Sequence, residues 1–191
     1  GYLGLALTDP DYFPATVMNM KLGGNFSGDV NLVLREEKGF TYGARTRFSG
    51  TIFPGKFTAS SGVRSNTTEE SINIFKDLMT AYRDPIAEED LDFTKNVLLK
   101  SNARRFETLG ALRGMISNIA TYGFPFDYIK DQEEIVSDMT VESHNELARK
   151  LIRPNEMIYL VVGDAATQLD GLKSLGFGDP ILLDGDGNTV E

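Results

Sequence analysis

Polar and apolar positions alternate in two stretches near the start of the chain. Residues 40–48 and 56–64 have the two-residue period of a β-strand. The Pro54-Gly55 pair between them predicts a turn, so the two stretches are expected to pair as an antiparallel hairpin. A short apolar run over residues 2–7 predicts one more strand ahead of them.

Spacings of three and four residues between apolar positions predict helices in much of the remaining sequence. The first is expected over residues 15–22, where Gly23 and Gly24 loosen or break it before a second half continues to Lys38. Thr67 with Glu70 has the spacing of a capping box, and Thr140 is expected to cap a later helix. The other helices are expected at residues 67–82, 88–105, 109–122, 128–136, 140–152 and 164–175.

Two late apolar runs, at residues 157–162 and 180–183, have the length of strands. Strands therefore fall into an early group and a late pair with helices between them, which is typical of an α+β fold. We expect a mixed, mainly antiparallel sheet with helices packed on one face. The 191 residues, of which 41% are hydrophobic, suit one domain over residues 1–191.

The stretch 22–43 carries the clearest functional pattern. One helix face is expected to bury Leu22, Phe26, Val30 and Val33 or Leu34. Lys38 and Gly39 mark the end of this helix, and a strand begins at Phe40.

Arg35 precedes that turn and Tyr42 follows it, so their polar tips are expected to converge on one point. Each also has a structural interpretation. Arg35 would be a helix-end arginine paired with a neighbouring carboxylate. Tyr42 would be a core residue, because Phe40, Ala44 and Phe48 lie on its predicted strand face, whereas Thr41, Arg45 and Arg47 lie on the other.

These residues also carry a resemblance to a known family. Leu22-Gly23-Gly24-x-Phe26-Ser27, followed by Leu34-Arg35-Glu36-Glu37-Lys38-Gly39-Phe40-Thr41-Tyr42-Gly43, resembles the second-domain signature of the pitrilysin/insulinase-type zinc metallopeptidases, which include the mitochondrial processing peptidases. The order of the predicted elements is also similar over nearly the whole chain. The resemblance implies the α+β architecture of the metallohydrolase domains of processing peptidases.

The resemblance further implies a peptide-binding role. Arg35 and Tyr42 would reach from the non-zinc domain and hold the substrate backbone beside the metal. The loop residues Gly23, Gly24, Asn25, Phe26 and Ser27 would let a peptide backbone come close; a helix kink without a ligand is the alternative. Gly28-Asp29 departs from the commoner family pattern at this loop.

The family's zinc motif, His-x-x-Glu-His, is not in this sequence, which has one histidine, His144, and no cysteine. We therefore expect no metal site in this chain, with zinc on a partner domain of the same chain or on a partner subunit. His144 itself is interpreted as an ordinary helix residue. Asp184, Asp186 and Asn188 are interpreted as a turn rather than a calcium loop.

Composition excludes some partners. The net charge of −9 and the isoelectric point near 4.7 argue against nucleic-acid binding. No apolar run approaches the ~20 residues of a membrane span. The sequence does not begin with methionine, and its first residues lack the pattern of a signal peptide, so we expect a fragment of a longer polypeptide. The compartment stays unassigned, with the periplasm or cell envelope slightly favoured over the cytoplasm.

Two functions of different classes follow. In the first, the chain is the substrate-binding and closing domain of a zinc-dependent metalloendopeptidase and is inactive alone. In the second, it is a non-catalytic scaffold or assembly subunit of the same fold. A His-x-x-Glu-His motif elsewhere in the same gene or an adjacent one would favour the peptidase.

Overall fold

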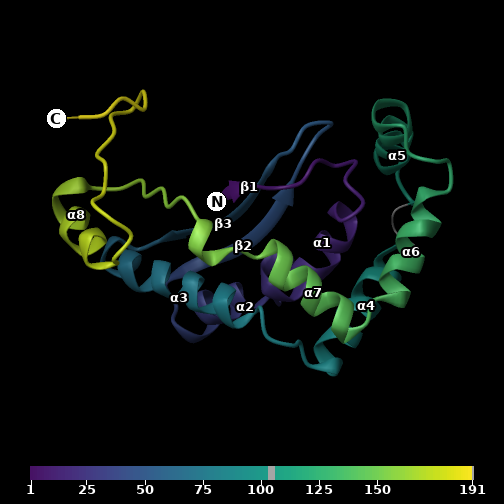
Figure 1. The fold of residues 1–191 in the computed structure, drawn as a ribbon, viewed down its shortest axis with the longest axis horizontal. Coiled ribbons are helices and arrows are strands. Elements are labelled where there is room, and N and C mark those ends of the chain that lie inside the picture. Colours follow the sequence, from purple (N-terminus) through teal and green to yellow (C-terminus); the bar gives the residue numbers. More distant parts are fainter. Residues whose placement is uncertain (103–105, 191) are drawn as a thin grey trace.

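The computed structural model describes residues 1–102 and 106–190 and contains a small sheet with helices beneath it (Figure 1). The sheet consists of β1 (Tyr2–Leu3), β2 (Thr41–Ser49) and β3 (Lys56–Val63), in the order β1-β3-β2. Both pairings are antiparallel, with Phe57 opposite Phe48 on one side and Tyr2 on the other. The predicted hairpin is confirmed.

Helical segments fill most of the remaining described chain. They are α1 (Tyr12–Asn19), the π-helical η1 (Met20–Gly24), α2 (Asp29–Asn31), the π-helical η2 (Leu32–Glu37), the 3₁₀ turn η3 (Ser65–Thr67), α3 (Thr68–Ala81), α4 (Glu88–Asn102), α5 (Leu109–Tyr122), α6 (Tyr128–Asp138), α7 (Val141–Leu151), the 3₁₀ turn η5 (Pro154–Glu156) and α8 (Ala165–Ser174). The expected continuation of the 88–105 helix over residues 103–105 lies outside the described residues.

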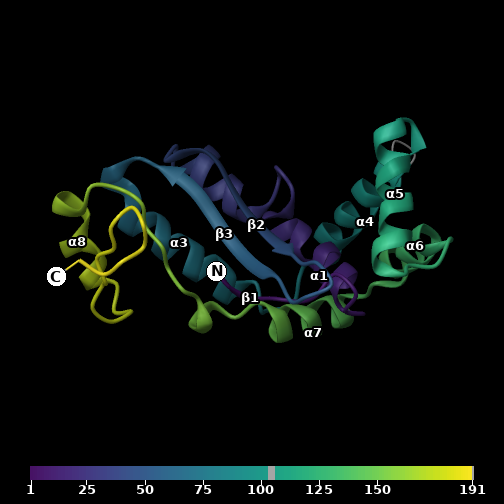
Figure 2. The ribbon, with the colours of Figure 1, turned by 90° about the horizontal axis from the view of Figure 1, so that it is seen from above.

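The core lies between the sheet and the helices on one of its faces. The ring of Phe57 is 4.9 Å from that of Tyr2 and 4.8 Å from that of Phe48, centroid to centroid. Helices α1, α2, α3 and α7 lie on this side of the strands, as Figures 1 and 2 show together. The fold is therefore α+β with helices on one face, as expected.

The other face of the sheet carries no described helix directly over the strands (Figures 1 and 2). Helix α5 stands beyond one end of the sheet, and α8 with the C-terminal segment stands beyond the other. None of the described residues of α5 is buried, and its Leu109 and Ile116 side chains are largely exposed. The open face is thus the floor of a concave side of the molecule.

The helix ends test the capping predictions. Thr140 and Ser143 form a reciprocal capping box at the start of α7, so the predicted cap is confirmed. The capping box predicted for Thr67 and Glu70 is wrong. The Thr67 hydroxyl instead donates to the Arg64 carbonyl oxygen at 2.9 Å, within the 3₁₀ turn that precedes α3.

The two late strands are wrong predictions. Residues 157–162 run in extended form beside the N-terminus, where Gly1 and Ile158 exchange backbone hydrogen bonds of 2.9 Å, but they form no strand. At residues 180–183 only Leu183 forms an isolated bridge, with Thr189. Two backbone N–H groups, of Asp186 and Asn188, donate to the Asp184 carboxylate, so the expected turn is present.

Candidate functional site

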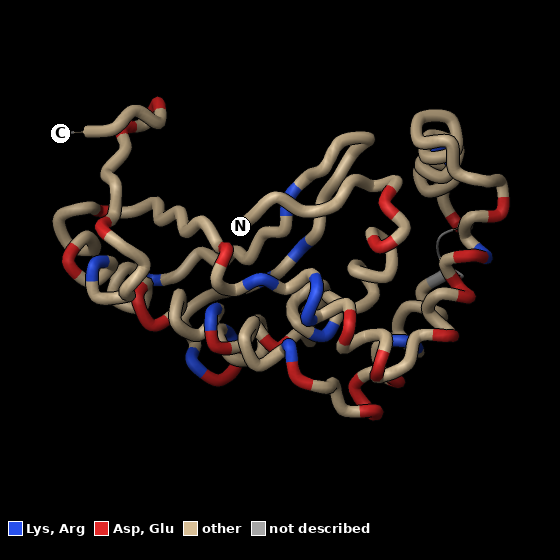
Figure 3. Tube along the Cα trace, viewed as in Figure 1, with Lys and Arg blue, Asp and Glu red and all other residues tan. Residues whose placement is uncertain are grey.

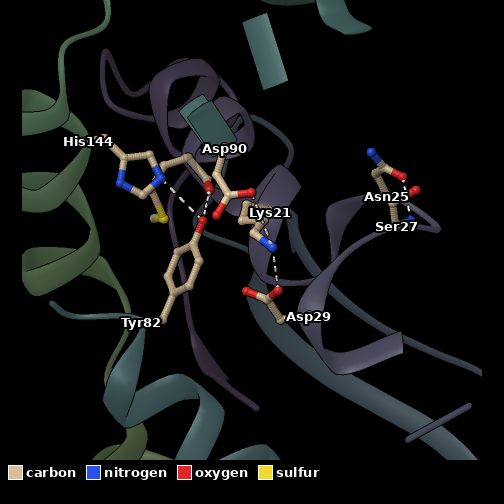
Figure 4. Close-up of polar contacts among 8 residues, drawn as sticks. Lys21, Asn25, Ser27, Asp29, Tyr82, Asp90 and His144 are labelled. Atoms are coloured by element: carbon tan, nitrogen blue, oxygen red, sulfur yellow. Dashed lines mark hydrogen bonds and ion pairs between the residues drawn. The ribbon is translucent and has the colours of Figure 1, made fainter. Parts of the chain in front are cut away.

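The stretch 22–43 contains the end of the π-helical η1, a tight loop, the short α2, the π-helical η2 and the start of β2. The π-helical η1 ends at Gly24, so the predicted helix break is confirmed. In the loop, the Asn25 Oδ1 atom accepts a hydrogen bond from the Ser27 N–H at 2.7 Å (Figure 4). The Gly28 N–H donates to the Asn25 carbonyl oxygen at 3.0 Å, which fixes the loop in one compact shape.

Gly23 is needed by the fold. It is buried, and a Cβ atom there would lie 2.6 Å from Val30 Cγ2 and 2.7 Å from the Thr46 backbone nitrogen. The helix approaches β2 this closely only without a side chain at this position. Gly24 is instead exposed and lines a cleft described below.

Arg35 lies in η2 and is held on two sides. Its Nη1 atom is 2.9 Å from Glu36 Oε1, the kind of ion pair that the structural interpretation predicted. Its guanidinium carbon lies 4.5 Å from the centre of the Phe26 ring. Phe26 is 65% exposed, so its predicted burial is wrong: the loop carries it outward before the helix resumes, whereas Leu22, Val30 and Leu34 are buried as predicted.

Tyr42 is 97% exposed, so its interpretation as a core residue is wrong. The register of β2 against β3 is irregular between Thr41 and Ala44, and this irregularity breaks the alternation that would have turned Tyr42 inward. Ala44 and Phe48 are buried as expected. Among the described residues no hydrogen bond joins Tyr42 to Arg35, so their convergence on one point stays a prediction.

Two asparagines that the sequence analysis did not single out tie the helices to β2. Asn31 accepts from the Ala44 N–H at 3.0 Å and donates to the Phe26 carbonyl oxygen at 2.8 Å. Asn19 donates to the Thr46 carbonyl oxygen at 3.0 Å and accepts from its hydroxyl at 2.7 Å. The sequence signal for these two contacts was an asparagine at a helix position expected to be buried, because a buried amide group needs hydrogen-bond partners.

A cleft of about 610 Å³ lies between β2 with α1 and η1 on one side and α5 with α6 on the other. Arg45 and Arg47 line it from β2, and both side chains point away from the buried face of the strand, as predicted. The other lining residues are neutral: Tyr12, Phe13, Thr16, Asn19, Met20, Gly23, Gly24, Thr46, Phe48, Ala111, Gly114, Met115, Asn118, Tyr128, Ile129 and Gln132. The sequence patterns did not predict that α5 lies opposite β2 across this cleft.

His144 lies at the junction of three helices. The Tyr82 hydroxyl donates to the Met18 carbonyl oxygen at 2.6 Å and lies 3.2 Å from His144 Nε2 (Figure 4). Burial lowers the pKa of His144 to about 4 and raises the pKa of Tyr82. The imidazole is therefore neutral and structural, in agreement with its interpretation as an ordinary residue.

These residues do not fit a zinc ion. His144 is 2% exposed and faces a tyrosine hydroxyl, and the sequence has no cysteine. Within residues 1–102 and 106–190 no group of three or more His, Asp or Glu side chains is placed to hold a metal. The carboxylates of Asp29 and Asp90 instead pair with Lys21, at 2.7 and 3.5 Å (Figure 4).

The fold and this stretch define a class: an α+β domain with a three-stranded antiparallel sheet, whose described residues offer no zinc-ligand set. The model of the peptidase M16 inactive domain matches residues 1–98. The chain therefore belongs to the M16 inactive-domain family, which is the second domain of the pitrilysin/insulinase type that the motif resembled.

Solved structures share this fold. The peptidase M16 inactive domain from Pseudomonas fluorescens is 24% identical with a TM-score of 0.74, and the match covers 81% of this chain and 37% of that one. A protease from Helicobacter pylori is 14% identical with a TM-score of 0.67, over 81% of this chain and 38% of that one. The periplasmic protease PqqL from Escherichia coli is 16% identical with a TM-score of 0.59, over 78% of this chain and 16% of that one.

The chain thus spans less than half the length of each of these three proteins. No curated protein sequence matches it. None of its described helices combines the length and the apolar character that a membrane crossing requires.

Proposed function

We propose that this chain is the substrate-binding and closing domain of a zinc-dependent metalloendopeptidase, in which Arg35 and Tyr42 hold the peptide beside zinc on a partner domain or subunit. The observation that carries the proposal is the 97% exposure of Tyr42 next to a buried strand face. A phenol that the fold does not use is free to donate to a substrate carbonyl.

Arg35 supports the same proposal. Its side chain is 34% exposed, and the Phe26 ring and the Glu36 carboxylate restrict its orientation. A guanidinium held in this way loses little conformational freedom when it binds a peptide carbonyl. The loop residues Gly24, Asn25 and Ser27 adjoin Phe26 in the sequence and would form the wall along which the peptide backbone runs.

The proposal extends to the assembly. We take residues 1–191 as one domain that closes over the peptide against the zinc-bearing domain, because closure expels water and completes the set of donors. An envelope compartment is proposed with it, since one structural neighbour is a periplasmic protease.

Two conservative substitutions test the proposal. Arg35→Lys keeps the charge but loses the planar fork, and Tyr42→Phe keeps the ring but loses the hydroxyl. In the complete peptidase, with the zinc domain present, either change is expected to lower kcat by about 10²-fold, because the donors act mainly in the transition state. The free energy of unfolding should stay nearly unchanged. Full activity of both variants would contradict the proposal.

A scaffold role is the second candidate. It is favoured by α5, whose described residues are all at least partly exposed and which carries Leu109 and Ile116. Exposed apolar side chains on one helix suit a protein partner. If Arg35→Lys and Tyr42→Phe leave activity intact while Ile116→Ser lowers association with the partner subunit, the scaffold is the correct function.

A further inference from the structure

The cleft beside β2 is positively charged, although the protein as a whole is acidic. The sequence holds 28 acidic residues against 19 lysines and arginines, yet the charged side chains among the described cleft residues are those of Arg45 and Arg47. Neither arginine forms an ion pair with another described residue. Figure 3 shows acidic residues spread over the helices, whereas the charged positions on the two long strands are basic.

The spacing between the two arginines matches the spacing between alternate side chains of an extended peptide. They are two residues apart on β2, and neighbouring same-face side chains of a strand are separated by about 6.5–7 Å. A peptide lying extended along the cleft presents every second side chain at the same interval. Two carboxylates at alternate positions could therefore each meet one guanidinium, whereas adjacent carboxylates point to opposite sides.

Three backbone groups of β2 are already hydrogen-bonded within the protein and are not available to such a peptide. The Ala44 N–H is bound by Asn31, the Thr46 carbonyl by Asn19, and the Phe48 carbonyl by the Tyr12 hydroxyl at 3.3 Å. β2 is an outer strand of the sheet, and Thr46 and Phe48 line the cleft. A ligand cannot replace the bonds at Ala44 and Thr46 without breaking buried hydrogen bonds, so recognition there falls to side chains.

We infer that this cleft binds the acidic side chains of the peptide substrate, with Arg45 and Arg47 each holding one carboxylate of a Glu-x-Glu or Asp-x-Asp segment. The inference rests on the proposed function and adds a substrate class to it. Charge-assisted guanidinium–carboxylate bonds supply the attraction. The apolar side chains of Phe13, Met115 and Ile129 would contact the residues between.

Peptide binding to the purified chain tests the inference by fluorescence anisotropy. The probes are fluorescein-labelled peptides that are amidated at the C-terminus and contain Glu-Ala-Glu, Gln-Ala-Gln, Lys-Ala-Lys or the permuted Glu-Glu-Ala. Glu-Ala-Glu is expected to bind about tenfold more tightly than Gln-Ala-Gln, because each charged hydrogen bond contributes more than its neutral counterpart. Lys-Ala-Lys should bind most weakly. The permuted peptide Glu-Glu-Ala should lose most of the tenfold gain in affinity over Gln-Ala-Gln.

Substitutions of the two arginines test whether the preference for Glu-Ala-Glu arises in the cleft. The double variant Arg45→Gln/Arg47→Gln should abolish the preference for Glu-Ala-Glu, and an unchanged melting temperature would show that the fold is retained. Arg64→Gln is the matched control: it removes one positive charge from an exposed position outside the cleft and should keep the preference. Because Arg64→Gln removes one charge and the double variant two, a preference that Arg64→Gln weakens by half as much as the double variant, or more, would reflect overall charge and overturn the inference.

Other outcomes separate this inference from the proposed function. Equal binding of Glu-Ala-Glu and Gln-Ala-Gln, or of Glu-Ala-Glu and Glu-Glu-Ala, overturns the inference, and the proposed function still stands if Arg35→Lys lowers activity. If no peptide binds and Arg35→Lys leaves activity unchanged, both are wrong.

Discussion

The Arg35 guanidinium lies 4.5 Å above the centre of the Phe26 ring, on the loop that separates the two π-helical segments. This contact joins two residues of the proposed site that are nine positions apart in the sequence. It gives Phe26 a role that its exposure alone would not suggest: the ring restricts where the arginine points.

Phe26→Leu is therefore expected to reduce activity without unfolding the protein. A cation–π contact at an exposed site contributes about 0.5–1 kcal/mol, so kcat/KM of the complete peptidase should fall by about two- to fivefold. Because Phe26 is 65% exposed, the free energy of unfolding should change little. Phe53→Leu, at a position 69% exposed in the hairpin loop, is the matched control, and equal kinetics of the two variants would refute this role.

Gly23→Ala should destabilise the fold. The added Cβ would lie 2.6 Å from Val30 Cγ2 and 2.7 Å from the Thr46 nitrogen, so the helix or β2 must move, at a cost of about 1–3 kcal/mol. Urea denaturation measures this change. Gly110→Ala in α5 is the control, because its nearest atom is 4.0 Å away, and it should be neutral or stabilising by up to about 1 kcal/mol. Equal midpoints would argue against the tight packing.

Acid should weaken the fold through His144. Its pKa is lowered from 6.5 to about 4, so the folded state favours the neutral imidazole and the unfolded state takes up the proton first as the pH falls. The stabilisation is complete above pH 6.5 and declines towards pH 4, by up to about 3 kcal/mol for a shift of this size. Denaturant titrations at several pH values measure it, and His144→Gln should flatten the dependence. The same slope in the variant would assign the effect to carboxylates.

The purified chain should hold no stoichiometric zinc. Its single histidine is buried against Tyr82, and the described residues contain no other set of metal ligands. Chelators are expected to leave the melting temperature unchanged. One zinc ion per chain after dialysis, measured by elemental analysis, would show that the ligand assignment is wrong.

Much of the fold follows from local patterns that the structure retains. Helix α5 has the predicted bounds, 109–122, because its cap residue Thr108 and the terminal Gly123, at φ 70°, act within one turn of the chain. The hairpin follows from alternation and a Pro-Gly turn. Such signals depend on a few neighbouring residues and are therefore readable in the sequence.

The failed predictions depend on contacts between distant segments. Tyr42 turns outward because the pairing of β2 with β3 is irregular, and the local sign of this was Gly43, since a glycine inside a strand often marks a bulge. Phe26 fits a helical period, but the chain leaves the helix at Gly24 and resumes it at Asp29. Residues 157–162 have the composition of a strand, yet a strand also needs a partner strand, and here Ile158 exchanges backbone hydrogen bonds with the single residue Gly1.

The cleft was only partly predictable from the sequence. The alternation of β2 correctly placed Arg45 and Arg47 on one face, but their importance appeared only when α5 and α6 were positioned opposite them. Sequence spacing gives the local direction of a side chain, whereas the walls of a cleft depend on how separate elements pack.

Because His144 is the single histidine of the chain, its imidazole is also a natural spectroscopic label. It lies where α7 meets the Tyr82 hydroxyl and the Met18 carbonyl, so its ring protons sense any displacement among these helices. A single resolved aromatic resonance can thus report, without isotope labelling of other sites, whether the arrival of a partner or a peptide on the open face of the sheet is transmitted to the layer of helices behind it.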